Sequence, residues 1–189
     1  MSENRPYCYL LSPDDFELST EMFANPTRFR GVEVTSESSN GLKMKLPGDG
    51  SAYLRVIKGD ELAETLAELD RQLHEYSPES AVNWMRSYLK GVSTAVIMEF
   101  EQENFASQQA AEEVRCAVWE KAKGLWHYPS ESYSNEHGAL VMVVPTGGID
   151  GKRVVATLKD GDWVEYTIDL TNSVRFDRFK RGQLPPGIV

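Results

Sequence analysis

The chain has 189 residues and a formal net charge of −9, with 41% hydrophobic and 26% charged residues. These fractions are ordinary for a globular protein and exclude a disordered one, and the length suits a single domain. Because phosphates are negative, the charge disfavours direct binding to nucleic acid, whereas it suits a basic partner.

The cysteines and the apolar runs indicate a cytoplasmic protein. Cys8 and Cys116 lie far apart, and a secreted fold that depends on disulfides would carry more cysteines. The N-terminal segment, residues 1–6, is polar and lacks the apolar core of a signal peptide. The longest apolar runs, near 92–98 and 139–145, fall short of the roughly 20 residues that span a bilayer. We therefore expect a soluble protein without a membrane partner.

In the N-terminal part, Tyr7–Leu11 reads as a first strand. Ser12 and Pro13 then predict a helix start, and this helix would run to about Phe23. Three further strands are predicted at Arg28–Thr35, Leu42–Leu46 and Ala52–Ile57, the last two as a hairpin.

Helices dominate the middle of the chain. A helix is predicted from Asp60, a second from Ser77 as cap with Pro78 at its first position, and a third over Ser107–Lys123 with Gly124 as its stop. The expected buried stripe of the first helix is Leu62, Leu66, Leu69 and Leu73, and that of the second is Val82, Met85 and Leu89.

Strands return in the C-terminal part. The apolar run Val92–Phe100 predicts a central strand, and Asp160-Gly161 predicts a hairpin turn. The other predicted strands are Leu125–Tyr128, Ala139–Val144, Val154–Lys159 and Trp163–Leu170. Together these elements predict an α+β fold, with a mixed, mainly antiparallel sheet and about three to four helices packed on it. We expect one domain over 1–172, followed by an irregular basic tail over 173–189.

The most acidic segment is residues 60–79, where seven acids face one base, a balance of −6. Glu61, Glu64 and Glu68 lie off the leucine stripe of the first helix, so we predict an acidic binding face there for a basic partner. A solvated helix face is the alternative. Glu99, Glu101 and Glu103 alternate at a strand end, but no further ligand type accompanies them, so no metal site is predicted.

The most unusual segment is residues 126–138, which is predicted to be a loop rich in aromatic side chains. A His–Glu–His set could bind zinc, although the spacing matches no compact zinc motif. A ligand or partner surface agrees better with the abundance of Trp, Tyr and His, and packing on the sheet edge is the alternative. The predicted binding residues in this loop are Trp126, His127, Tyr128, Tyr133 and His137.

Other catalytic patterns fail on their local context. Residues 146–153 resemble a phosphate cradle, but a strand follows Lys152 where a helix is required. Cys116 lies in mid-helix beside Arg115, without a paired histidine, and no Gly-x-Ser-x-Gly elbow exists. The catalytic residues are therefore unknown, and no cofactor is predicted.

The C-terminal residues 171–189 have a net charge of +3 and two phenylalanines among the basic residues. This pattern suits a segment that docks on an acidic surface, or one that packs against its own domain through the phenylalanines.

One family resemblance concerns Thr94 through Val143, about a quarter of the chain. This stretch orders an apolar strand, an amphipathic helix ending at Gly124, an aromatic strand and the turn Glu136-His137-Gly138 into another strand. In layout, acidity and missing catalytic residues, the chain resembles immunity proteins of bacterial toxin–immunity systems. The resemblance implies a protein that binds a toxin and occludes its active site.

The leading hypothesis is a non-enzymatic cytoplasmic protein that holds a basic protein partner, such as a toxin, on its acidic surface. One alternative is a small hydrolase or metal-dependent enzyme with its site in residues 126–138. Another is a structural or assembly subunit, for which a symmetric homo-oligomer would bury Trp84 and Trp163.

Overall fold

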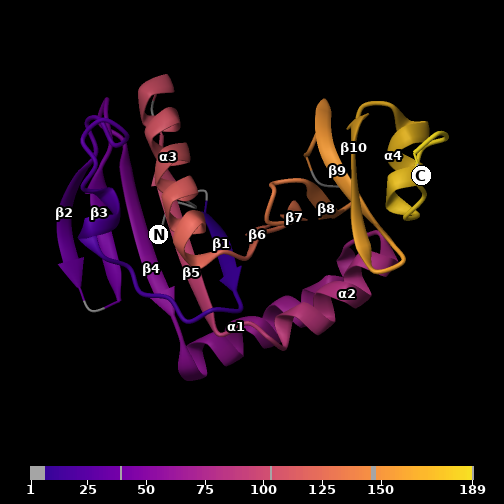
Figure 1. Cartoon of the computed structure of the whole chain (residues 1–189), viewed down its shortest axis with the longest axis horizontal. Coiled ribbons are helices and arrows are strands. Elements are labelled where there is room, and N and C mark those ends of the chain that lie inside the picture. The colour runs from indigo at the N-terminus through magenta and orange to yellow at the C-terminus, as the bar shows by residue number, and fades with distance from the viewer. Residues whose placement is uncertain (1–6, 39, 103, 146–147, 189) are drawn as a thin grey trace. The chain divides into compact units, whose positions relative to one another are not determined.

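The computed structural model describes residues 7–38, 40–102, 104–145 and 148–188, so Glu103 and Thr146-Gly147 lie outside the described part. The chain divides into two compact units, residues 1–62 with 92–124 and residues 63–91 with 125–189. Helix α1 (Gly59–Gln72) begins in the first unit and ends in the second (Figure 1). The assignment of residues 1–172 to one domain stays a prediction.

The first unit contains five strands, and each neighbouring pair is antiparallel. In sheet order they are β1 (Tyr7–Ser12), β5 (Thr94–Glu101), β4 (Ser51–Ile57), β3 (Gly41–Lys45) and β2 (Glu33–Ser38). Helix α3 (Phe105–Ala122) contacts β5 (Figure 1). The central place predicted for the apolar run around β5 is confirmed, because β5 pairs with β1 on one side and β4 on the other.

The predicted helix from Ser12 to Phe23 is wrong, apart from the single 3-10 turn η1 (Thr20–Phe23). Ser12 remains the last residue of β1, where its hydroxyl donates to the Ala122 carbonyl at 2.5 Å and accepts from the Asp14 amide. This long-range bond competes successfully with local capping. The strand predicted from Arg28 begins only at β2, because turns precede it.

Helix α3 begins slightly earlier than predicted. Asn104 is its cap, and its side chain accepts from the Ser107 amide while the Ser107 hydroxyl accepts from the Asn104 amide, a reciprocal capping box. After the helix, Gly124 has φ +116 and lies so close to β1 that an added Cβ would be 2.1 Å from the Leu11 carbonyl oxygen. Only glycine fits this close approach.

The second unit contains a mixed set of strands. In sheet order they are β10 (Asp162–Asp169), β9 (Lys152–Lys159), β8 (Leu140–Val143), β7 (Ser132–Ser134) and β6 (Leu125–Tyr128). β8 and β9 are parallel, and the other pairs are antiparallel. The predicted α+β class with a mixed, mainly antiparallel sheet is thus confirmed. Asp160 and Gly161 form the predicted hairpin turn, with φ of 55 and 98.

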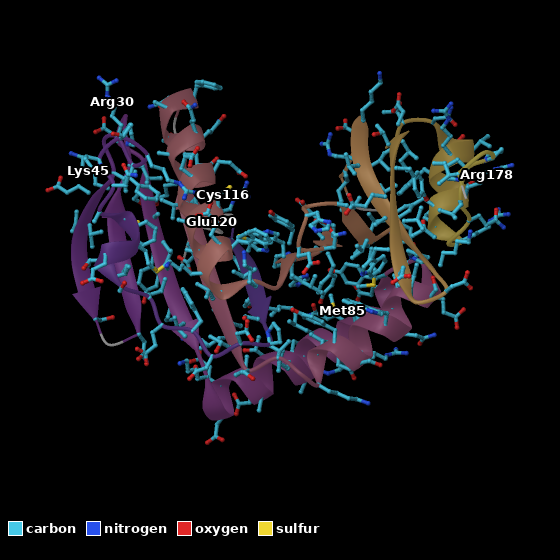
Figure 2. All side chains as sticks on the ribbon, in the orientation of Figure 1. Arg30, Lys45, Met85, Cys116, Glu120 and Arg178 are labelled. Carbon is cyan, nitrogen blue, oxygen red and sulfur yellow. The ribbon has the colours of Figure 1, made fainter. Side chains whose placement is uncertain are left out.

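Helix α2 (Glu79–Leu89) follows the short turn η2 (Leu73–Glu75). Its predicted apolar stripe is confirmed, and Met85, labelled in Figure 2, is fully buried at 0% exposure. Ser77 does not cap the helix, because Pro78 is at the cap position and makes no side-chain bond. The Ser77 backbone instead exchanges two 3.0 Å hydrogen bonds with Val143.

The predicted irregular tail is wrong over helix α4 (Ser173–Lys180). The Asn172 side chain caps this helix by accepting from the Arg175 amide at 3.1 Å. Phe179 is fully buried in an apolar cluster with Val155, Tyr166 and other residues of the second unit. Burial of this ring anchors the helix, which Figure 1 shows beside β10.

Candidate functional site

The segment 126–138 begins in strand β6, as predicted for Leu125–Tyr128, but its middle, predicted as a loop, forms the further strand β7. β7 pairs with both β6 and β8. His127 and Tyr133 are cross-strand partners whose rings stack with centroids 4.1 Å apart. Tyr76 packs edge-on against Tyr133 at 5.1 Å. His127 and Tyr133 are 1% and 0% exposed, so these rings belong to the interior of the second unit.

Burial controls the chemistry of His127. It lowers the pKa of the imidazole to about 4, although a hydrogen bond with the Ser132 backbone acts in the opposite direction. The ring is therefore neutral at physiological pH. Among the described residues, no group of three or more His, Cys, Asp or Glu side chains is placed to hold a metal ion.

The remaining residues of this segment are distributed over different environments. Trp126 is buried at 9% exposure and lies opposite Ser134, while Tyr128 is half-buried. His137 is exposed, and its Nδ1 lies 3.0 Å from Glu165 Oε1 on β10. The structure thus groups His127 with Tyr133 in the interior and places His137 at the surface.

The predicted acidic face on α1 lies at the surface, and part of its charge is paired. Glu61 bonds Arg55 at 2.5 Å, and Glu68 contacts Arg71 and accepts from Gln72. Glu64 is exposed. Within the described part of the chain, the acids of residues 60–79 without an ion pair are Asp60, Glu64, Glu75 and Glu79.

A groove of about 610 Å³ lies in the first unit between α3 and the segment 27–32. Arg28 lines it and donates to both Glu113 and Glu120; the latter is labelled in Figure 2. These bonds raise the pKa of Arg28, while the Arg28 bond lowers the pKa of Glu120. Because the Arg28 guanidinium already pairs with two carboxylates of α3, it is less available to bind an anion in the groove.

A second surface, on β10, combines a carboxylate with aromatic rings. Glu165 Oε1 accepts from Asn135 Nδ2 at 2.9 Å and also bonds His137. The Asn135 bond, followed by His137, lowers the pKa of Glu165. Asn135 is only 3% exposed, and its Oδ1 accepts from the amides of His137 and Ala139. The carboxylate is thus held in place and ionised.

The aromatic part comes from α2 and β10. Trp84 stacks on Tyr88 at 5.2 Å and meets Trp163 edge-on at 5.1 Å. All three side chains are partly exposed. We name this set, together with Glu165, the β10 patch. Sequence reasoning noted Trp84 and Trp163 only as a surface for oligomers and missed Glu165. Residues 160–169 carry four acids and no lysine or arginine, and this local charge imbalance is the signal that could have found it.

No α-helix in the described ranges combines the length and the apolar character needed to cross a bilayer. Comparison with protein-family models, with curated proteins and with solved structures gives no match for this chain.

Proposed function

We propose that this chain is a non-catalytic cytoplasmic binding protein that holds a basic protein partner on the acidic surface of residues 60–79. In this proposal the partner is a toxin, and binding neutralises it by covering its active site. The resemblance to immunity proteins supports the toxin, and the geometry of the acidic segment supports the basic partner.

The observation that carries the proposal is the charge left over on this segment. Its seven acids meet Arg71 inside the segment and Arg55 and Arg86 outside it. Counting these three arginines leaves a balance of −4. Six of the seven acids are exposed, and only Glu68 is half-buried. Uncompensated exposed charge of one sign speeds the encounter with a partner of opposite charge.

The test begins with cross-linking and purification of the tagged full chain from its host, followed by identification of the captured proteins. The affinity of the purified pair is then measured between about 50 and about 500 mM NaCl. Salt screens exposed charges over about 10 Å at 0.1 M, so the affinity should fall steeply with salt. A chain that purifies alone at physiological salt, or an affinity independent of salt, argues against the proposal.

A matched pair of variants locates the surface. The triple variant Glu64→Gln, Glu75→Gln and Glu79→Gln removes three exposed acids from the segment. It should weaken binding by roughly tenfold, because about 0.5 kcal/mol for each of the three charges sums to about 1.5 kcal/mol. The control triple variant Asp14→Asn, Glu17→Gln and Glu21→Gln removes equal charge from exposed positions of the first unit and should change binding little.

The toxin part has its own readout. The captured partner is expressed alone and with this chain, and its effect on growth of the host is compared. Protection by the wild type but not by the Glu64, Glu75 and Glu79 triple variant supports neutralisation. If the partner is harmless when expressed alone, it is not a toxin, and only the proposed binding of a basic partner remains.

A further inference from the structure

The β10 patch has the composition of a recognition site for a cationic side chain. Trp84, Tyr88 and Trp163 supply three aromatic rings, each partly exposed to solvent, and Trp84 contacts both of the others. Tryptophan and tyrosine are the residues most enriched at the energetic centres of protein interfaces. Aromatic faces also attract cations through their electron-rich π systems.

The carboxylate of Glu165 lies beside these rings. Trp163 and Glu165 are two positions apart on β10, so their side chains project from the same face of the strand, roughly 7 Å apart along it. Their partners on β9 are Leu158 and Ala156. Ala156 is fully buried at 0% exposure, whereas Glu165 keeps 35% of its side chain exposed, so access to the carboxylate depends on its own exposure and not on an open strand surface.

The geometry of Glu165 leaves one oxygen for an incoming donor. The hydrogen bonds of Glu165 with Asn135 and His137 both use Oε1. In the described part of the chain, no hydrogen bond reaches Oε2, and the side chain is 35% exposed. A carboxylate already oriented by buried Asn135 loses little freedom when it accepts a further bond.

We propose that the β10 patch binds an arginine side chain of the basic partner, with the guanidinium stacked on Trp163 and donating to Glu165 Oε2. This inference rests on the proposed function, to which it adds a specific anchor. A guanidinium fits better than an ammonium, because its plane stacks on an aromatic face while its edge donates to a carboxylate.

The charge of Glu165 favours a cationic side chain over a second copy of the patch. Two other acids of β10, Asp162 and Asp169, lie opposite Lys159 and Lys152 of β9, whereas Glu165 lies opposite Ala156 and has no base across the ladder. A second copy that docked through the same patch would bring two Glu165 carboxylates together, and like charges in contact destabilise self-pairing.

The direct test uses a defined probe and the four tryptophan indoles of the chain as reporters. A blocked pentapeptide of glycine with two arginines is titrated into the ¹⁵N-labelled full chain at low salt, and the indole N–H signals are followed by NMR. The signals of Trp84 and Trp163 should shift in a saturable manner, while those of Trp119 and Trp126 should not. Equal shifts with a citrulline peptide, which has the same shape without the charge, would overturn the proposal.

Conservative variants then test the carboxylate. Glu165→Gln keeps an oxygen that accepts from Asn135, so the fold is retained, but removes the charge. It should weaken binding of the arginine peptide by about tenfold, corresponding to one lost charge-assisted bond. Glu136→Gln, which neutralises an exposed acid 3.7 Å from His137, is the matched control and should have little effect. Equal affinities of wild type and Glu165→Gln would contradict the anchor.

The partner separates this proposal from the proposed function. Once a partner has been identified, both variants are tested against it. If the Glu64, Glu75 and Glu79 variant loses binding and Glu165→Gln does not, the acidic segment binds the partner and the β10 patch does not. If the arginine peptide binds in a manner that depends on Glu165, but the host contains no basic protein partner, the β10 patch binds arginine and the proposed function fails. Sedimentation that shows a wild-type dimer abolished by Trp163→Leu would assign the patch to a second copy and overturn the arginine anchor.

Discussion

The imidazole of His127 and the ring of Tyr133 stack at 4.1 Å across the β6–β7 hairpin, with an interplanar angle of 23°. Because both rings are buried, protonation of the imidazole would place a charge in the interior of the second unit. His127, which the sequence predicts to be a binding residue, is thus a neutral residue of the core, and its pKa of about 4 has a consequence for stability.

Stability should fall between pH 6.5 and pH 4 because of His127. Its pKa is lowered from 6.5 in the unfolded chain to about 4 in the folded one, so the unfolded state binds more protons in this window. The contribution is complete above about pH 6.5 and is lost as the pH falls toward 4. At pH 4.5 the loss should be roughly 2 to 3 kcal/mol, measured by urea unfolding.

Two variants isolate this effect from that of the carboxylates. His127→Phe should reduce the difference in unfolding free energy between pH 7 and pH 4.5 by this amount. His74→Gln removes an exposed histidine and should leave the difference unchanged. An equal pH dependence in wild type and His127→Phe would show that burial of His127 has no such role.

Gly124→Ala should destabilise the chain by at least about 3 kcal/mol. The backbone there has φ +116, and the new Cβ would lie 2.1 Å from the Leu11 carbonyl oxygen, which belongs to a paired strand and cannot move away. Gly138→Ala is the matched control, because φ is +79 there and nothing lies within 4 Å of the added Cβ. It should lose only about 1 kcal/mol. Similar thermal unfolding of the two variants would contradict the close approach of β1.

Truncation of Phe179 should destabilise the second unit by roughly 3 to 5 kcal/mol, since this fully buried ring fills a core shared with β9 and β10. Val174, on the same helix, is 68% exposed, and Val174→Ala should change stability by less than about 0.5 kcal/mol. Chemical unfolding of both variants checks the helix directly. If Phe179→Ala is as mild as Val174→Ala, the C-terminal segment does not form part of the core.

Removal of Asn135 should raise the pKa of Glu165 toward 4.5. The hydrogen bond from Asn135 is the largest cause of the lowered pKa, and the bond with His137 is a smaller one. The pKa of Glu165, measured from its carboxyl ¹³C shift as a function of pH, should therefore rise more in Asn135→Ala than in His137→Ala. The opposite order would mean that His137, and not the buried amide, orients this carboxylate.

Local patterns predicted the elements whose signal is contained within a short stretch of sequence. The turn residues Asp160 and Gly161 predicted the β9–β10 hairpin, and the apolar run of β5 predicted a central strand. β7 was missed because its three residues include two serines, and they form a strand only through pairing with β6 and β8. Helix α4 was missed because proline residues that follow it obscured the spacing of Phe176 and Phe179.

The candidate site was predictable only in part, because some of its features are properties of composition and others are contacts between segments distant in sequence. The acidity of residues 60–79 is a property of composition, so it could be found without a structure. The contact between Trp84 and Trp163 joins a helix to a strand distant in sequence, and no local pattern encodes it. The partners of Glu165 likewise come from the turn after β7.

The two-residue turn at Asp160-Gly161 also limits how this protein can vary during evolution. Trp163 and Glu165 share one face of β10, and Val164 and Tyr166 share the other. Insertion of a single residue that shifts the pairing would exchange the two sets, so that a tyrosine would replace the carboxylate on the face that carries Trp163. We therefore expect relatives of this chain to differ in the side chains of this hairpin and to keep its length, so that any change of partner would arise by substitution.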